Sequence, residues 1–158
     1  MLAPMMHWRD VARSANLSRA LPFRDNGSHR ITSREGDDMS TVDEYDAITQ
    51  TIQHYIDGAK SGKGDAMRPA FHESATIFGY AGPDLMAGPI EELFAFNDDN
   101  GPAPDIRARI TSIDLAETVA TVRLEIDEWT GDRYTDLFTL LKVDGTWKIM
   151  NKVFHLYD

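Results

Sequence analysis

The chain has 158 residues, of which 42% are apolar, and contains no cysteine. This length suits one domain of ordinary size, and the absence of cysteine excludes disulfides, iron–sulfur sites and thiol nucleophiles and disfavours structural zinc. A formal net charge of −10 would repel nucleic acid backbones and anionic membranes. Since no long apolar run or secretory-type segment is visible either, we expect a cytoplasmic protein that binds neither nucleic acid nor membrane.

Residues 1–38 differ in composition from the rest, which predicts a domain boundary near Met39. They hold six arginines, no lysine and five acidic residues, whereas most of the negative charge follows them. Their apolar residues keep no sustained period, so we expect a disordered or non-native N-terminal extension followed by a domain over 39–158. Two explanations stay open beside simple disorder: a transit peptide, which the acidic residues disfavour, and a true translation start at Met39.

The domain begins with a predicted amphipathic helix. Thr41 to Glu44 has capping-box spacing, and Gly62 and Gly64 end the helix. Its apolar stripe consists of Val42, Tyr45, Ile48, Ile52, Tyr55, Ile56 and Ala59. This stripe should face a core.

Two shorter helices and a strand should follow. Asp65 would cap a second helix that reaches about Phe71, and Gly88-Pro89 would open a third, with proline at its first position. A strand is expected between them over 75–81, and a polar loop after them over 97–102.

Four strand-like runs complete the chain, over about 105–113, 118–129, 133–143 and 146–156. Short turns, including Gly131-Asp132 and Asp144-Gly145, predict an antiparallel meander. The expected fold class is therefore α+β, with three N-terminal helices packed on a curved, mostly antiparallel sheet.

Tight turns would fix which side chains share the helix-facing side of this sheet, here called the inner face. The predicted inner face holds Val122, Leu124, Ile126, Glu128, Thr135, Leu137, Thr139, Leu141, Met150, Lys152 and Phe154. The predicted outer face holds Arg123, Glu125, Asp127, Trp129, Tyr134, Asp136, Phe138, Trp147, Asn151 and His155. A bulge would exchange the faces beyond it, so the last strand stays open.

Three segments, YIDGAKSGKGDAM (55–67), AFHESATIFGY (70–80) and TDLFTLLKVDGTWKIMNKVFH (135–155), resemble the nuclear transport factor two-like superfamily, and within it the putative lumazine-binding group near the SnoaL-like polyketide cyclases. The resemblance covers 39–158. It implies a cone-shaped fold around a small-molecule pocket, usually in a homodimer formed through the outer face of the sheet. It does not imply one reaction, because relatives include isomerases, dehydratases, epoxide hydrolases, cyclases and binding modules.

Comparison with two enzyme types of the superfamily narrows the chemistry. Steroid isomerases use a helix tyrosine and two sheet acids; Tyr55 matches the tyrosine, but Gly79 and Thr139 stand where the acids should be. That proton-abstracting dyad is therefore not expected. Arg123-Leu124-Glu125 with Asp136 weakly resembles the epoxide hydrolase pattern, but the predicted register turns these charges outward, which favours a salt-bridged dimer surface.

The candidate catalytic residues are Tyr55, Lys152, His72 and His155. Tyr55 could donate a hydrogen bond to a substrate carbonyl or enolate, or be a core tyrosine. Lys152, facing an apolar cavity, could bind an anionic ligand or act as an acid or base; its alternatives are snorkelling or pairing with Glu128. Either histidine could be a general base or a structural residue.

The candidate ligand-binding residues combine polar groups with rings that would stack on a flat molecule such as a pteridine. They are Thr139, Tyr80, Phe94, Trp129, Asp136, Asn151 and Phe154. Instead of binding a ligand, the rings could simply be part of the core. Likewise, Asp136 and Asn151 could form a hydrogen bond with each other across neighbouring strands. Five scattered histidines give no metal ligand set and no glycine-rich phosphate loop is present, so we expect neither metal nor cofactor.

These observations predict a homodimeric protein that binds a small apolar or aromatic molecule in a hydrophobic pocket. If it is an enzyme, the resemblance implies a cofactor-free isomerase, dehydratase, cyclase or hydrolase; without turnover it would be a carrier or sensor. The alternative is a non-catalytic dimeric protein-interaction domain.

Overall fold

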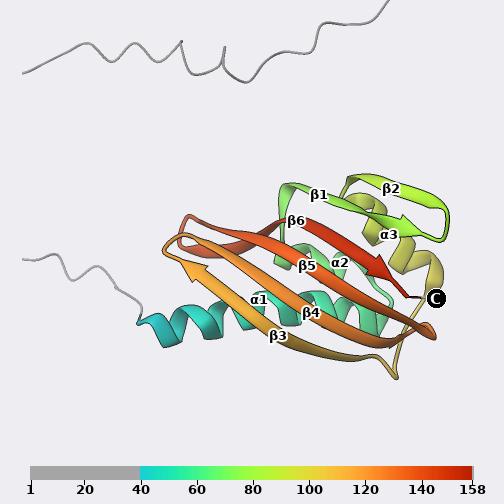
Figure 1. Cartoon of the computed structure of the whole chain (residues 1–158), viewed down its shortest axis with the longest axis horizontal. Coiled ribbons are helices and arrows are strands. Elements are labelled where there is room, and N and C mark those ends of the chain that lie inside the picture. Colours follow the sequence, from blue (N-terminus) through green and yellow to red (C-terminus); the bar gives the residue numbers. More distant parts are fainter. Residues whose placement is uncertain (1–39, 158) are drawn as a thin grey trace, which may run out of the picture. The chain divides into compact units, whose positions relative to one another are not determined.

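The computed structural model describes residues 40–157, and the predictions made for residues 1–38 lie outside the described residues. The domain is built on one six-stranded sheet with the strand order β2-β1-β6-β5-β4-β3 (Figure 1). Its strands are β1 (Phe71–Ala81), β2 (Asp84–Pro89), β3 (Arg107–Ala116), β4 (Val119–Trp129), β5 (Asp132–Val143) and β6 (Thr146–Leu156). Neighbouring strands are antiparallel except β1 and β6, which run parallel.

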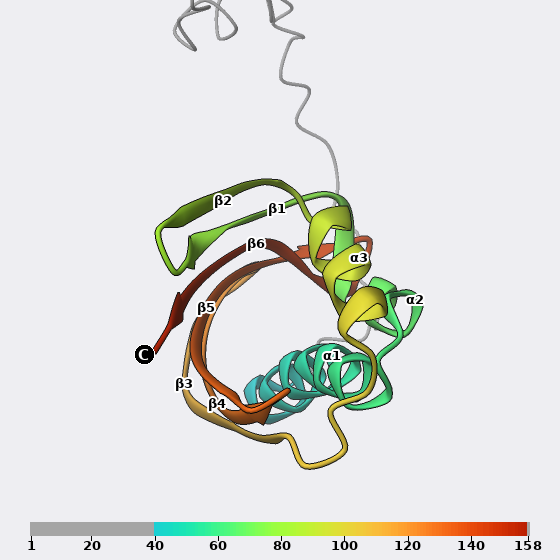
Figure 2. The same ribbon diagram turned by 90° about the vertical axis from the view of Figure 1, so that its right-hand side faces the viewer.

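Three helices pack on this sheet: α1 (Thr41–Ser61), α2 (Gly64–Met67) and α3 (Glu91–Asn100), with a short 3₁₀ turn, η2 (Arg68–Ala70), after α2. The sheet curls around α1, while α2 and α3 lie beside its open side (Figure 2). The α+β class, the meander β3 to β6 and the mostly antiparallel curved sheet are confirmed. Among the described residues, none of the helices is both long enough and apolar enough to span a membrane.

The first helix forms for the predicted reasons, with its cap one residue earlier. Ser40 is the N-cap and forms the capping box with Asp43. Gly62, with φ of 65°, ends the helix in the left-handed conformation that glycine adopts without cost. Of the predicted stripe, Ile48, Ile52, Tyr55 and Ala59 are buried and Ile56 is half-buried, but Val42 and Tyr45 are exposed.

The region between the first helix and the meander differs most from prediction. A hairpin strand, β2, was not predicted, and Pro89 ends it instead of opening α3. Ile90 takes the N-cap position, and α3 extends over part of the predicted polar loop. A hydrogen bond from the buried Asn97 amide to the Gly58 carbonyl of α1 (Nδ2–O 3.0 Å) stabilises this extension of α3. The second helix begins at Gly64, and Asp65 does not cap it as predicted: its carboxylate accepts from Arg68 and binds no backbone amide.

A bulge in β4 overturns the predicted register of β5. Ile126 pairs with Tyr134 and Trp129 pairs with Asp132, so that β4 contributes one residue more than β5 between these pairs. Glu128 lies at this bulge with φ of 60°. The extra residue exchanges the faces beyond it.

The resulting inner face of β5 consists of Tyr134, Asp136, Phe138 and Leu140, all buried. The predicted inward orientation of Thr135, Leu137, Thr139 and Leu141 is therefore wrong, as is the outward orientation of Trp129 and Asp136.

A second irregularity lies between β5 and β6. Thr139 pairs with Asn151 and Leu140 with Ile149, so Met150 is the extra residue. Trp147 lies between this irregularity and the turn and pairs with Lys142, so it follows the exchanged faces of β5 and faces the core instead of the outer face. Lys152 faces inward as predicted, and the exposed His155 faces outward as predicted.

Candidate active site

Two neighbouring strands bring a carboxylate and an ammonium together on the inner face. Asp136 of β5 is paired with Phe154, and Lys152 of β6 with Phe138, so the two charged residues are diagonal neighbours. This spacing is within reach of a long side chain. The Lys152 Nζ lies 2.7 Å from Asp136 Oδ1, and the two side chains are 2% and 0% exposed.

The first helix supplies the third member of this group. Tyr55 is 0% exposed, and its hydroxyl donates a hydrogen bond of 2.6 Å to Asp136 Oδ2. Edge contacts with Phe71, Trp129 and Phe138 hold its ring. One carboxylate therefore binds an ammonium on one oxygen and a phenol on the other, and we call Tyr55, Asp136 and Lys152 the buried triad.

Burial perturbs two members of the triad in opposite directions. Desolvation lowers the pKa of Lys152, because the ammonium has lost its water, and the adjacent Asp136 carboxylate opposes that shift. Desolvation raises the pKa of Tyr55 well above its usual value, and the charge of Asp136 and the hydrogen bond to it add to the rise. Tyr55 is therefore a neutral donor at physiological pH, and the Lys152 proton is more easily lost than that of an exposed lysine.

The lysine is surrounded by aromatic rings. Its Nζ lies 4.7 Å from the ring centroid of Phe154, 5.6 Å from that of Tyr55 and 5.8 Å from that of Trp129. Ring faces attract a cation, more strongly where water is excluded. These rings therefore offset part of the cost of burying the charge.

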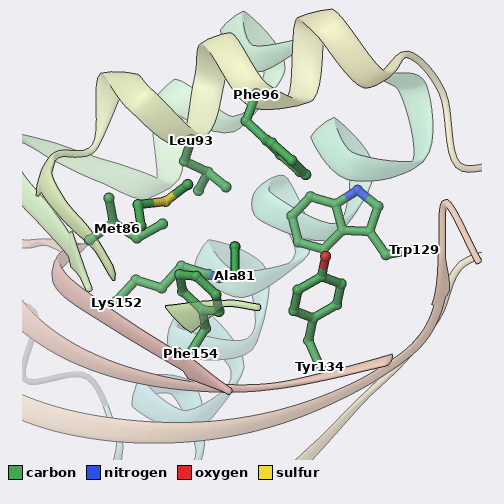
Figure 3. A pocket seen from close by; sticks show the side chains of 9 residues that line it. Ala81, Met86, Leu93, Phe96, Trp129, Tyr134, Lys152 and Phe154 are labelled. Carbon is green, nitrogen blue, oxygen red and sulfur yellow. The ribbon is translucent and has the colours of Figure 1, made fainter. Parts of the chain in front are cut away.

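Lys152 lies in the wall of an apolar pocket between α3, the β1–β2 hairpin and the ends of β4, β5 and β6 (Figure 3). The cavity has a volume of about 40 Å³. It is lined by Ile77, Ala81, Met86, Leu93, Phe96, Trp129, Tyr134, Lys152 and Phe154. This space holds only a few water-sized groups, so a larger ligand requires side chains of the wall to move.

One side of the pocket is formed by Phe154, whose ring lies over Gly79 of β1. A Cβ atom at Gly79 would overlap that ring, and the two residues are paired across β1 and β6. The half-buried Phe154 therefore occupies the space that a side chain at position 79 would need. Position 79 is the one that matches the catalytic base of the steroid isomerases.

Some buried polar atoms near the pocket lack partners. Within residues 40–157, Trp129 Nε1, Asn97 Oδ1 and Asp136 Oδ1 find no well-directed hydrogen bond. The Lys152–Asp136 contact is thus an ion pair by distance, without hydrogen-bond alignment. Buried polar groups without a hydrogen-bond partner are uncommon in folded proteins.

The predicted site residues separate into two groups. Tyr55, Lys152, Asp136, Trp129 and Phe154 come together in or beside the pocket. Asp136 joins them as a correction, because it was expected on the outer face. It has no contact with Asn151, whose amide instead donates to Thr76 Oγ1 (2.9 Å).

The other candidates lie elsewhere. Thr139 is exposed on the outer face, and Tyr80 and His155 lie on the outer face near the ends of β1 and β6. His72 borders a separate surface hollow together with Arg68, Glu73 and Phe94. Phe94 itself is buried against Phe71. These residues are not part of the pocket that contains Lys152.

Sequence reasoning missed two features of the site. Tyr134 was placed on the outer face, yet it is 8% exposed and lines the pocket; burial, with a smaller contribution from Asp132, raises its pKa to about 12. Met86 was missed because its strand was missed. A turn signal at Gly82-Pro83 could have indicated the hairpin. Among the described residues, no three acidic or histidine side chains gather as a metal site would require.

Comparison with known proteins identifies the family. The family described as putative lumazine-binding matches residues 43–155. A curated relative, "Aldolase FrzH" from Cladobotryum sp, is 32% identical over 118 residues, which are 74% of this chain and 94% of that protein.

Two solved structures are similar throughout the domain. A protein described as NTF2-like and of unknown function from Methylobacillus flagellatus KT is 48% identical, with a TM-score of 0.73 over 75% of this chain and 96% of its own. Another from Shewanella baltica OS155 is 39% identical, with a TM-score of 0.73 over 77% and 99%. The chain therefore belongs to the putative lumazine-binding family of the nuclear transport factor two-like superfamily.

Proposed function

We propose that this protein is an enzyme that binds a small, largely apolar carbonyl compound and catalyses an aldol-type reaction with its own side chains. The observation that carries the proposal is the ion pair of Lys152 and Asp136 in the wall of an apolar pocket. A buried charge pair stabilises a fold weakly at best, since desolvation offsets its attraction. Perturbed ionisable groups in a pocket are instead typical of functional sites.

The triad matches the requirements of aldol chemistry. Such a reaction removes a proton beside a carbonyl and stabilises the negative charge that develops on the oxygen. Lys152 offers a cation in a site of low dielectric, where one such donor contributes about 10²–10³ in rate. Asp136 offers a proton acceptor, and Tyr55 positions that carboxylate through its hydrogen bond.

The similarity to the aldolase FrzH supports the same reaction class, because it extends over 94% of that protein at 32% identity. Similarity of fold alone would not support a reaction class, since members of this superfamily catalyse many different reactions. We therefore infer that this chain acts on carbon–carbon bonds next to a carbonyl, in preference to the hydrolysis, dehydration or isomerisation that the sequence also allowed.

The lining of the pocket supports a small, largely apolar substrate. Its wall is almost entirely apolar, with Lys152 as its one ionisable amine among the lining residues. Ligand pockets commonly measure about 300–1,000 Å³, well above the present cavity. Met86 and Phe154, like Phe96, are half-buried members of the wall, and methionine is the most adaptable of apolar side chains. A ligand would enter by displacing Met86 and Phe154.

The test is a screen of the full-length protein by thermal shift, followed by turnover. The panel contains small ketones and aldehydes, with pteridines and flavins as competing ligand classes. A ligand that binds the folded state raises the melting temperature. Compounds that do so are then combined in pairs and followed by NMR for aldol or retro-aldol products. Lys152→Met should abolish turnover.

The matched control is Lys148→Met on the same strand, where the ammonium only contacts the Pro69 carbonyl at the surface. This variant should retain turnover. Carbonyl compounds that neither raise the melting temperature nor react would contradict the proposal, and a shift with pteridines alone would favour a carrier.

A second candidate function is the non-catalytic dimeric interaction domain. The small volume of the cavity favours it, because a pocket filled by protein side chains needs no ligand. Turnover that depends on Lys152 would exclude this candidate.

We also propose a homodimer formed through the outer face. Phe78, Val153 and Leu137 are cross-strand neighbours on β1, β6 and β5, and all are exposed. Arg123, paired with Leu137, extends the row and binds Glu125 (2.7 Å). An apolar row beside charges of both signs can complement a second copy of itself. Light scattering should show a dimer for the wild type and a monomer for Val153→Glu; a monomeric wild type would contradict it.

A further inference from the structure

The amine of Lys152 is placed for covalent chemistry as well as for electrostatic catalysis. It lies between three aromatic rings and one carboxylate, inside a pocket wall that is otherwise apolar. Burial strengthens the effect of a lysine cation on a substrate, but it also makes the charged form of the lysine costly. Burial does favour the uncharged amine, which is the nucleophilic form.

The ion pair offers a direct route to that form. Lys152 Nζ and Asp136 Oδ1 lie 2.7 Å apart, so a small rotation of the ammonium group and the carboxylate into hydrogen-bond alignment would let one proton pass between them. This transfer converts two buried charges into a neutral amine and a neutral acid. Losing both charges removes the desolvation cost of each. Tyr55 stays on the other oxygen of the carboxyl group, so Asp136 keeps its position during the transfer.

From this geometry we propose that Lys152 forms an imine with an enolisable ketone or aldehyde bound in the pocket. This inference rests on the proposed function and deepens it. The Nζ lone pair adds to the carbonyl carbon, and the carbonyl oxygen takes up the proton held by Asp136. The resulting carbinolamine takes up a second proton, one that Nζ has released, and loses water, leaving a protonated carbon–nitrogen double bond.

The remaining steps return every group to its starting state. Asp136 removes a proton from the carbon next to the iminium carbon, which gives an enamine. The enamine carbon attacks the carbonyl carbon of a second molecule, and that oxygen receives the proton from Asp136. Water then hydrolyses the new iminium, which releases a β-hydroxy carbonyl product and returns Lys152 to its ammonium form. Two carbonyl compounds become one, with no oxidation or reduction.

Access to the amine depends on Phe154. Its ring centroid lies 4.7 Å from Nζ, and the ring rests on the bare backbone of Gly79. Rotation of this half-buried ring would open a path from the surface, whereas Trp129 and Tyr55 on the other sides are buried. The carbonyl end of the substrate would reach Nζ, and its apolar remainder would occupy the place of the Phe154 ring. A small ketone with one apolar ring or chain suits this arrangement.

The experiment traps the imine by reduction. Full-length wild-type protein is incubated with acetone, cyclohexanone or phenylacetone and sodium cyanoborohydride, and then analysed by intact mass and by peptide mapping. Reduction of the imine adds the mass of the ketone less about 16 Da, because only the carbonyl oxygen is lost. We expect a single adduct per chain, mapped to Lys152. The wild type alone decides the result, so a folding defect in a variant cannot obscure it.

Two variants test whether the adduct depends on the amine of Lys152. Lys152→Arg keeps a cation beside Asp136 but has no nucleophilic amine, so it should lose the adduct, whereas Lys148→Met should keep it. Adducts spread over exposed lysines, or no adduct at Lys152 with any of the three ketones, would overturn the imine. If a carbonyl compound still raised the melting temperature or turned over in that case, the proposed function would stand without the imine; if none did, both would fall.

Discussion

Lys152 and Asp136 meet because two separate irregularities in the sheet turn both side chains to the same face. The bulge at Glu128 of β4 turns Asp136 toward the core. On β6, the extra residue Met150 lies between Ile149 and Lys152, so that Lys152 faces the core on the same side as Ile149. Regular strands with tight turns would have left Asp136 on the outer face. The 2.7 Å contact is thus a product of strand register as much as of residue choice.

The ion pair predicts a pattern of stability in a mutant cycle. Lys152→Met leaves the buried Asp136 charge unpaired and should destabilise the protein by about 3–5 kcal/mol. Adding Asp136→Asn removes that charge while keeping an acceptor for the Tyr55 hydroxyl, so the double variant should regain most of the loss. Urea unfolding followed by circular dichroism measures each free energy of unfolding. A single Lys152→Met variant as stable as the wild type would show that the pair is not formed.

Tyr55 predicts a loss of stability in alkaline solution. Its pKa is raised in the folded state by burial and by Asp136, while in the unfolded chain a tyrosine ionises near about 10. Its contribution is therefore complete below pH 10 and is lost as the pH rises above that value. The free energy difference between wild type and Tyr55→Phe should fall by about 1.4 kcal/mol per pH unit there.

The same variant should lose about 1–2 kcal/mol at neutral pH, because Asp136 Oδ2 loses its donor. Tyr80→Phe is the control, since this ring is exposed on the outer face. Urea unfolding between pH 7 and 11 gives both differences. Equal slopes for wild type and Tyr55→Phe above pH 10 would argue against the buried phenol.

The bulge at Glu128 makes a prediction about register. Glu128 has φ of 60°, a conformation that costs a non-glycine residue about 1–2 kcal/mol. Glu128→Gly should therefore fold normally and gain about 1 kcal/mol. Deleting Glu128 removes the extra residue and turns Asp136 and Phe138 outward, so this variant should lose the near-ultraviolet signal of packed aromatic rings. A deletion variant with wild-type packing would show that the bulge does not set the register.

Periodicity and turn residues predicted the architecture well, for physical reasons. The apolar repeat of α1 and the four alternating runs of the meander reflect burial of one face, which the sequence displays directly. Asp144-Gly145 does form the turn between β5 and β6, with positive φ at both residues. Tyr55 and Lys152 could be selected because one is an aromatic donor on a buried stripe and the other is an ammonium among apolar neighbours.

The composition of the site was harder to predict. A bulge adds one residue without any strong sequence signal, and Glu128 has no special preference for a left-handed conformation. Asp136, Tyr134 and Trp129 were therefore assigned to the wrong face, although the two aromatic side chains would have suited the core. Asp136 could not be recognised as a partner of Lys152, because their proximity depends on two strand pairings at once.

At the other end of the helix, Glu44 ties α1 to the sheet and gives a prediction in acid. Its carboxylate accepts from Lys142 Nζ of β5 and from Trp147 Nε1 of β6 (2.7 Å). The hydrogen bond from Lys142, followed by that from Trp147, lowers the pKa of Glu44 below its usual value. A lowered carboxyl pKa gives stability above the unfolded-state pKa of about 4.3, and this stability is lost as the pH falls through the folded-state value.

Glu44→Gln should therefore lose about 1–2 kcal/mol at pH 7, and its deficit relative to the wild type should shrink below pH 4. Glu73→Gln, at an exposed position of β1, is the control. Urea unfolding at pH 7, 5, 4 and 3 measures the difference, and a deficit that stays constant over this range would show that the Glu44 charge does not support the contact.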